Sequence, residues 1–145
     1  GHVAKPLAQV ASMADFEVHV IDERPEFATR ERFPSAVSVR CEQLEDVINE
    51  LPLSAEDTYA VVVTHDHALD ERITQAVMER EFKFLGVIGS QRKGDMFRKR
   101  LAAAGIEPAV IARMQTPVGL AIAAETPAEI ALSIGAELVR VRRNG

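Results

Sequence analysis

Residues suited to binding an anion gather in three short stretches of this sequence. The chain opens with "GHVAK", "THDHALD" begins at Thr64, and "GSQRKG" begins at Gly89. A glycine lets the backbone come close to a phosphate, and the first turn of a helix offers free N–H groups and a positive dipole end. Arginine and lysine add charge-assisted hydrogen bonds. These residue types predict a site for a ligand that carries an anionic group.

The opening stretch matches the second half of a dinucleotide-binding fingerprint. If Gly1 is the second glycine of G-x-G-x-x-G/A, Ala4 fills the third position, and Asp22 follows at the expected spacing, at the end of "EVHVID". Gly1 would then allow a phosphate to approach, and Asp22 would hydrogen-bond a ribose diol. The alternative is an ordinary helix start followed by an ordinary strand.

The second stretch allows two interpretations. His65 and His67 form an H-x-H pair, which on a strand would place both rings on one face and could hold a metal. The pair lies past the predicted strand end, however, and no second cluster completes a ligand set. We therefore favour a cleft loop in which Asp66 or Asp70 caps the next helix.

The third stretch also leaves two interpretations open. Ser90 stands at the N-cap position of a predicted helix, and its hydroxyl, the free N–H groups, Arg92 and Lys93 would together form an anion site. The alternative is a capped helix whose basic face is solvated.

The elements that must position these residues alternate between apolar and amphipathic segments. Helices are expected over residues 3–14, 41–51, 68–82, 91–105 and 126–145. Strands are expected over residues 17–22, 36–40, 59–64 and 84–90, with a short extended piece over 110–114. Thr126 and Glu129 have the spacing of a capping box, Gly105 is a helix stop, and Gly119 marks a turn or a close approach of the backbone.

This alternation predicts an α/β fold, a Rossmann-like doubly wound parallel sheet in which ligands bind beyond the carboxyl ends of the strands. The first strand is apparently missing upstream of residue 1. In such sheets that strand lies between those expected at 17–22 and 59–64, so we expect residues upstream of Gly1, from the same chain or another copy, to occupy the position. The last helix has either a core role or an interface role, so a homodimer is one alternative.

The bulk properties fit one globular domain. The chain has 145 residues, is 47% hydrophobic and carries a net charge of −5, which argues against a nucleic-acid-binding face. No apolar run is long enough for a membrane span, so no membrane association is expected. The single cysteine, Cys41, cannot form a disulfide framework, so a cytoplasmic location is expected, with Cys41 at least half-buried.

Several motifs in this order resemble the C-terminal Rossmann domain of the XdhC/CoxI family over practically the whole chain. They are "GHVAKPLA", "VHVIDERPEF", "RFP", "VVVTHDHALD", "LGVIGSQRK" and "TPVGLAIAAETPAEIALSI". The resemblance implies an accessory protein of xanthine dehydrogenase and related molybdenum hydroxylases, as the members of this family are. The resemblance makes residues 1–145 one such domain, with the "GAGH" turn reduced to "GH" and the N-terminal family domain absent from the sequence.

The resemblance implies a chaperone that binds the molybdenum cofactor, a phosphate-bearing pterin, holds it for sulfuration and passes it to a molybdenum hydroxylase apo-enzyme. A cysteine desulfurase is a further possible partner. On this mapping Gly1, His2 and Val3 meet the phosphate-bearing part, and Asp22 meets a diol or a pterin donor. The opposite wall is formed by Thr64, His65, Gly89, Ser90, Arg92 and Lys93. The mapping assigns no catalytic residue and no metal ligand.

The alternative function is an NAD(P)-binding, oxidoreductase-like domain, because Asp22 would also suit an adenosine ribose. Against an enzyme, the sequence offers no convincing Ser-Tyr-Lys set, since Tyr59 is its only tyrosine and lies in a predicted strand. We therefore expect a cofactor-binding protein rather than an enzyme.

Overall fold

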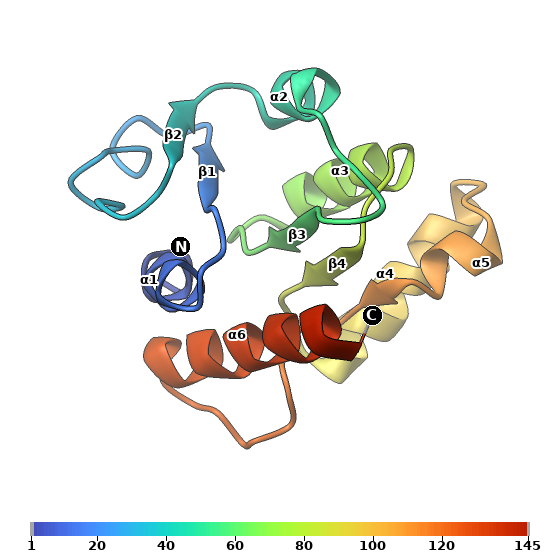
Figure 1. Ribbon diagram of the computed structural model, residues 1–145. Coiled ribbons are helices and arrows are strands. Elements are labelled where there is room, and N and C mark those ends of the chain that lie inside the picture. Colours follow the sequence, from blue (N-terminus) through green and yellow to red (C-terminus); the bar gives the residue numbers. More distant parts are fainter. Residues whose placement is uncertain (1, 145) are drawn as a thin grey trace. The chain divides into compact units, whose positions relative to one another are not determined.

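The computed structural model describes residues 2–144 and divides the chain into two compact units, each with its own parallel sheet. The second unit is the continuous segment Leu51–Val118, and the first unit combines the residues before it with those after it. Figure 1 shows the elements of both units coloured along the chain.

The first unit contains two strands and three helices. In chain order these are helix α1 (Ala4–Met13), strands β1 (His19–Asp22) and β2 (Ser38–Cys41), and helices α2 (Leu44–Glu50) and α6 (Pro127–Asn144). The strands run parallel, with Asp22 opposite Cys41 at their carboxyl ends. Ala8, Phe33 and Ala36 form a small buried cluster beside this sheet.

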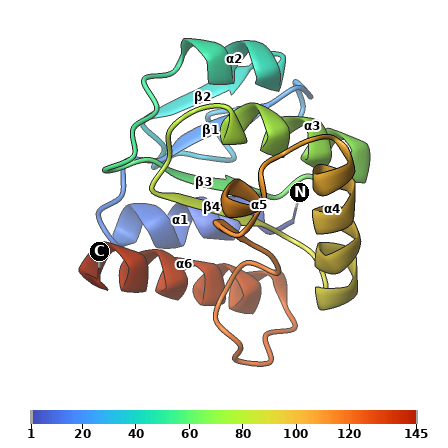
Figure 2. The same cartoon turned by 90° about the vertical axis from the view of Figure 1, so that its right-hand side faces the viewer.

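Helix α1 packs against α6, and the two helices lie side by side in Figures 1 and 2. Leu7 on α1 and Ile134 and Leu138 on α6 are buried, so this face of α6 belongs to the core of the first unit. At Gly135 an added Cβ would lie 2.5 Å from Val10 Cγ1. The glycine therefore allows α1 to approach α6 closely, because real Cβ contacts are not this short.

The first turn of α6 has the predicted capping box. Thr126 Oγ1 accepts a hydrogen bond from the Glu129 N–H at 3.1 Å, and Glu129 Oε1 accepts one from the Thr126 N–H at 3.0 Å. The Glu125 N–H also donates to Glu129 Oε1, at 2.8 Å. The two side chains thus satisfy N–H groups that a helix start leaves without intrahelical partners.

Gly119, just before this helix, confirms both features expected of it. Its φ is +107°, and an added Cβ would lie 2.4 Å from Ser133 Oγ. Its N–H donates at 2.7 Å to Oε1 of Glu137, a carboxylate that is buried on α6. The turn is therefore attached to the body of the last helix.

The second unit contains three strands and three helices. In chain order these are β3 (Tyr59–Val62), α3 (His67–Met78), β4 (Phe84–Val87), α4 (Gln91–Ala103), α5 (Pro108–Ile111) and β5 (Met114–Gln115). The strand order is β3-β4-β5, all parallel, with Val62 opposite Val87. Every residue of β4 is buried, as expected for the central strand of a parallel sheet.

The extended piece predicted over residues 110–114 is wrong in its first part. Pro108 is the first residue of the short helix α5, and the Ile111 and Ala112 N–H groups donate to the carbonyls of Glu107 and Pro108. Proline is favoured at that position because its fixed φ suits a helix start and its missing N–H costs nothing there. Extended backbone begins only at Met114.

The expected burial of Cys41 is also wrong. It ends β2 with its side chain exposed, and Sγ lies 3.6 Å from the Glu23 carbonyl oxygen. Cys41 lies in the last position of its strand, where the sheet ends and solvent begins, and residue type alone does not reveal this position.

The alternating parallel architecture confirms the predicted α/β, Rossmann-like fold. Among residues 2–144, β1 pairs with β2 in one unit and β3 pairs with β4 in the other. The strand expected upstream of Gly1, and its place in the sheet, stay a prediction. No helix within residues 2–144 combines the length and the apolar character needed to cross a membrane.

Candidate functional site

Six of the predicted site residues lie in the second unit, at the carboxyl ends of two neighbouring parallel strands. Thr64 and His65 follow β3, and the others follow β4 at Gly89, Ser90, Arg92 and Lys93. The Ile88 N–H donates to the Val62 carbonyl at 3.0 Å, so the two strands remain paired up to the start of both loops. The fold thus brings the two groups of residues to one edge of the sheet.

Ser90 caps α4, which confirms its predicted position. Its side-chain oxygen accepts a hydrogen bond from the Lys93 N–H at 3.2 Å. Gly89, immediately before it, has a φ of +156°, a backbone conformation that residues other than glycine rarely adopt. The glycine therefore lets the chain turn from β4 into the helix.

Asp66 caps α3, which confirms the capping interpretation of "THDHALD". Its Oδ1 accepts hydrogen bonds from the Ala68 and Leu69 N–H groups at 2.9 and 3.2 Å. His65 and His67 are exposed on either side of it. Within residues 2–144, no three His, Cys, Asp or Glu side chains are grouped so as to hold a metal ion.

Asp70, one turn into α3, is a buried carboxylate with only 3% of its surface exposed. The Thr64 hydroxyl donates to its Oδ1 at 2.5 Å, while Thr64 Oγ1 accepts from the Asp66 N–H at 3.1 Å. Burial raises the pKa of Asp70, and the hydrogen bonds from Thr64 lower it by a smaller amount. Thr64 therefore acts on this carboxylate, a role that differs from the wall position expected for it.

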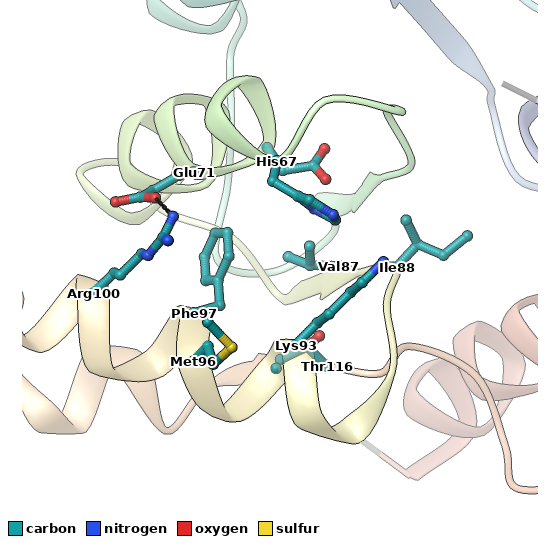
Figure 3. Close-up of a pocket in the computed structure, with 11 residues that line it drawn as sticks. His67, Glu71, Val87, Ile88, Lys93, Met96, Phe97, Arg100 and Thr116 are labelled. Carbon is teal, nitrogen blue, oxygen red and sulfur yellow. Dashed lines mark ion pairs between the residues drawn. The ribbon is translucent and has the colours of Figure 1, made fainter.

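A pocket of about 190 Å³ lies between α3 and α4, beside the carboxyl end of β4 (Figure 3). Its walls are mostly apolar, from Val87, Ile88, Met96 and Phe97, with Gly94 and Thr116 beside them. Its charged or titratable groups are His67, Asp70, Glu71, Lys93 and Arg100. Apolar walls with a few convergent polar groups are typical of small-molecule sites.

The cations of the pocket differ in whether they have a partner. Arg100 Nη1 lies 3.6 Å from Glu71 Oε2, so its charge is already paired. The Lys93 ammonium has no hydrogen-bond or ion-pair partner within residues 2–144, and it extends toward the end of the pocket where His67 lies (Figure 3). Lys93 is therefore the cation best placed to meet an incoming anion.

Of the pocket residues, sequence reasoning proposed Lys93 for ligand binding, named His67 and Asp70 for other roles, and missed the rest. A signal exists for the others, because residues three or four apart share one face of a helix. On α4, Lys93, Phe97 and Arg100 follow this spacing, and on α3 His67 and Asp70 do so. The pattern becomes informative only once the two helices are known to face each other.

The predicted residues of the first unit are less directly available to a ligand. Gly1 lies outside the described residues. His2 is exposed, whereas Val3 is buried with 9% exposure and its carbonyl accepts the Leu7 N–H at 3.0 Å. Near the start of α1, Val3 therefore offers a ligand only its main chain.

Asp22 lies at the end of β1 as predicted, but its carboxylate is already engaged. Its Oδ1 accepts from the Arg24 N–H and Nε at 2.9 and 3.0 Å, and its Oδ2 accepts from Nη2 at 2.9 Å. Burial acts to raise the pKa of Asp22, but the hydrogen bonds and charge of Arg24 outweigh it, so the pKa is lowered. Arg24 in turn stacks on Phe27, 3.9 Å from the ring centroid.

Comparison with known proteins identifies a family. A family model described as the XdhC Rossmann domain matches residues 1–138. The uncharacterized protein YqeB of Escherichia coli K12 is 32% identical over 99% of this chain, and a probable xanthine dehydrogenase subunit from Bacillus subtilis is 33% identical over 95%. The chain spans 26% and 39% of the lengths of these two relatives.

A solved structure agrees with this match. A crystal structure of a xanthine dehydrogenase from Bacillus halodurans superimposes with a TM-score of 0.85 and 29% identity. The superposition covers 99% of this chain and 40% of that one. The match therefore concerns one domain of a longer protein.

Proposed function

This chain belongs to the family of XdhC Rossmann domains, and we propose that it serves as an accessory domain that binds the molybdenum cofactor for xanthine dehydrogenase or a related molybdenum hydroxylase. In this role it holds the cofactor for sulfuration and insertion into the apo-enzyme. The observation that carries the proposal is the family match over residues 1–138, with relatives described as xanthine dehydrogenase proteins.

The chemistry of the second unit supports this proposal. The cofactor is a fused pterin ring with a phosphate, so it needs an apolar surface, a few hydrogen-bonding groups and a cation. The pocket between α3 and α4 offers apolar walls, the buried Asp70, and Lys93, whose ammonium has no partner among residues 2–144. The residues present therefore fit the two ends of this ligand.

This chain contributes charged and correctly oriented groups to ligand binding. Lys93 attracts the phosphate, and the first turn of α4 adds the positive end of the helix dipole. Ser90 keeps that turn ordered by accepting the Lys93 N–H. The molybdenum centre supplies the redox chemistry of the hydroxylase after delivery, and this chain takes no part in that step.

A titration of the 145-residue chain tests the proposal. Purified molybdenum cofactor, NAD⁺ and NADP⁺ are added separately, and binding is measured by calorimetry. We expect the molybdenum cofactor to bind most tightly, and replacing Lys93 with alanine to weaken binding about tenfold, the loss typical of a charge-assisted hydrogen bond. Lys99→Ala is the matched control, because Lys99 is exposed on the same helix outside the pocket.

A second measurement addresses delivery. Apo xanthine dehydrogenase is incubated with the cofactor, with and without this chain, and the cofactor content of the re-isolated enzyme is measured. We expect faster loading when the chain is present. Tight binding of NAD⁺ together with no binding of the molybdenum cofactor would show that the proposal is wrong.

One observation favours a second candidate, an NADP-binding domain. In Rossmann folds the acidic residue at this strand end binds the ribose, and a nearby arginine binds a phosphate on that ribose by donating hydrogen bonds to it. Asp22 and Arg24 occupy these places but bind each other. The same titration decides the matter, since this candidate requires NADP⁺ to bind more tightly than the molybdenum cofactor.

A further inference from the structure

One carboxylate of the second unit has no structural task that accounts for its burial. Asp66 already caps α3, so Asp70 is not needed for capping. Yet Asp70 is 3% exposed and lines the pocket, and within residues 2–144 its carboxylate has Thr64 as its one hydrogen-bonding residue. A buried carboxylate is costly unless its acceptor sites are filled. The Asp70 carboxylate can therefore accept further hydrogen bonds from a molecule in the pocket.

The remaining surface of the pocket suits a flat ring. Val87 and Ile88 end β4, and Phe97 projects from α4 into the space between the helices (Figure 3). An aromatic side chain beside aliphatic ones favours a planar, weakly polar ligand through stacking and burial. The volume of about 190 Å³ is below the range of about 300–1,000 Å³ for sites that enclose drug-sized ligands. It therefore suits one ring system, with the rest of the ligand outside.

We propose that this pocket binds the amino-oxopyrimidine edge shared by pterins and guanine. The Asp70 carboxylate accepts two hydrogen bonds, one from the exocyclic amine and one from the adjacent ring N–H. Phe97 packs against the ring, and Lys93 at the mouth holds the attached anionic group. This assignment rests on the proposed function for its choice of ligand, because a pterin carries this edge.

Thr64 is a positioning residue in this arrangement. Its hydroxyl donates to Oδ1 of Asp70, and its own oxygen accepts the Asp66 N–H. These contacts hold the carboxylate against the loop that joins β3 to α3. Planar recognition by a carboxylate depends on its orientation, because both hydrogen bonds must lie near the plane of the ring.

A pair of ligands that differ only at the amine tests the proposal without any variant. Pterin carries the amine, whereas lumazine carries a carbonyl oxygen in its place. We expect the 145-residue chain to bind pterin about tenfold more tightly than lumazine, because lumazine turns an oxygen toward the carboxylate. Pterin fluorescence quenching measures the affinity directly. Equal affinity for the two would overturn the proposal.

A second ligand pair distinguishes the two sources of the edge. Guanosine monophosphate carries the amine and inosine monophosphate lacks it. For each pair we compare the affinity of the ligand with the amine to that of the ligand without it. If this affinity ratio is larger for pterin and lumazine, the pocket is assigned to a pterin ring. If it is larger for the two nucleotides, the pocket is assigned to a guanine base. Either result supports the shared chemistry, and no preference in either pair contradicts it.

Variants then locate the recognition at Asp70. We expect Asp70→Asn to weaken pterin binding about tenfold and to abolish the preference over lumazine, since the amide presents donors where the ligand also has donors. Asp95→Asn is the matched control, because Asp95 is exposed on α4 and does not line the pocket. Thermal unfolding of each variant verifies that it is folded. An unchanged preference in folded Asp70→Asn would overturn the assignment.

Failure of this inference is distinguishable from failure of the proposed function. If the molybdenum cofactor binds equally well to the parent chain and to folded Asp70→Asn, the pocket assignment is wrong while the accessory role stands. If pterin binds through Asp70 but the chain does not promote loading of xanthine dehydrogenase, the accessory role is wrong while the pocket assignment stands.

Discussion

At the end of β1, Asp22 and Arg24 form an ion pair that includes two side-chain hydrogen bonds. The carboxylate accepts both guanidinium hydrogen bonds and the Arg24 N–H, and the guanidinium stacks on Phe27. A ligand that uses Asp22 must therefore compete with Arg24. This local competition explains why the residue type and spacing of Asp22 were predictable but its availability was not.

Replacing Arg24 with alanine should destabilise the fold in a pH-dependent way. Burial acts to raise the pKa of Asp22, but Arg24 outweighs it and the pKa is lowered. Ionised Asp22 therefore stabilises the fold above its ordinary pKa, and this contribution is lost as pH falls through the lowered value. We expect Arg24→Ala to lose about 1 kcal/mol at pH 7 and much less in strong acid, measured by urea unfolding.

Arg40→Ala provides the comparison for this experiment. Arg40 pairs with Glu42 and Glu50 at the surface, where solvent screens the charges, so we expect its replacement to cost less than that of Arg24. A loss for Arg40→Ala as large as that for Arg24→Ala would contradict a special role for the Asp22 pair.

Asp70 should show the opposite pH dependence. Burial raises its pKa, so its contribution to stability is present below the ordinary value and is lost as pH rises through the raised one. We expect Asp70→Asn to be more stable than the parent chain at pH 7 by about 0.5–1 kcal/mol, the gain typical of relieving a functional site. Thermal unfolding at pH 7 and pH 4 measures the difference, which should shrink at pH 4. A variant clearly less stable at pH 7 would show that the ionised carboxylate is needed by the fold.

Side-chain capping is a local determinant of three helices, α3, α4 and α6. Ser90, Asp66 and Thr126 each stand at the residue before a helix and each accepts an N–H of its first turn. Ser90 and Thr126 were predicted as caps and Asp66 as one of two alternatives with Asp70, because capping depends on a few consecutive residues. The helix at Pro108 was not predicted, because its β-branched Val110 and Ile111 favour a strand while the proline before them starts a helix.

The capping box of α6 allows a test at the scale of one helix. Thr126→Ala removes the acceptor of the Glu129 N–H, and we expect a loss of about 1 kcal/mol in the free energy of unfolding. Thr126→Ser keeps the hydroxyl and should lose much less. Urea unfolding followed by circular dichroism measures both variants. Equal losses for alanine and serine would mean that the methyl group matters rather than the hydrogen bond.

At the scale of the whole chain, the order of helices and parallel strands could be predicted from the sequence. Most of the residues that line the pocket could not. Alternating apolar and amphipathic segments are properties of consecutive residues, so the elements were found to within a few positions. The burial of Asp70 and the packing of Phe97 into the pocket depend on residues of other elements. No pattern local to α3 or α4 determines which faces of these helices meet.

The contact between α1 and α6 joins distant parts of the chain, and Gly135 tests it. Gly135→Ala would place a methyl group 2.5 Å from Val10 Cγ1, and we expect a loss of about 1–2 kcal/mol from overpacking despite the better helix propensity of alanine. Val10→Ala in the same chain removes the obstructing methyl groups, so the double variant should recover part of that loss. Urea unfolding of the two single variants and the double variant gives the coupling energy, and additive losses would argue against direct contact.

This pairing also has a consequence for synthesis on the ribosome. The second unit is one continuous segment, so its three strands and their helices emerge together and can fold as they emerge. The apolar face of α1, in contrast, waits for α6, which is translated only after the whole second unit, a delay on the order of ten seconds at typical elongation rates. During that interval Leu7 and Val10 are available to ribosome-associated chaperones or to other nascent chains. Slower translation of the segment before Thr126 should therefore lengthen the period in which the new chain is prone to aggregate.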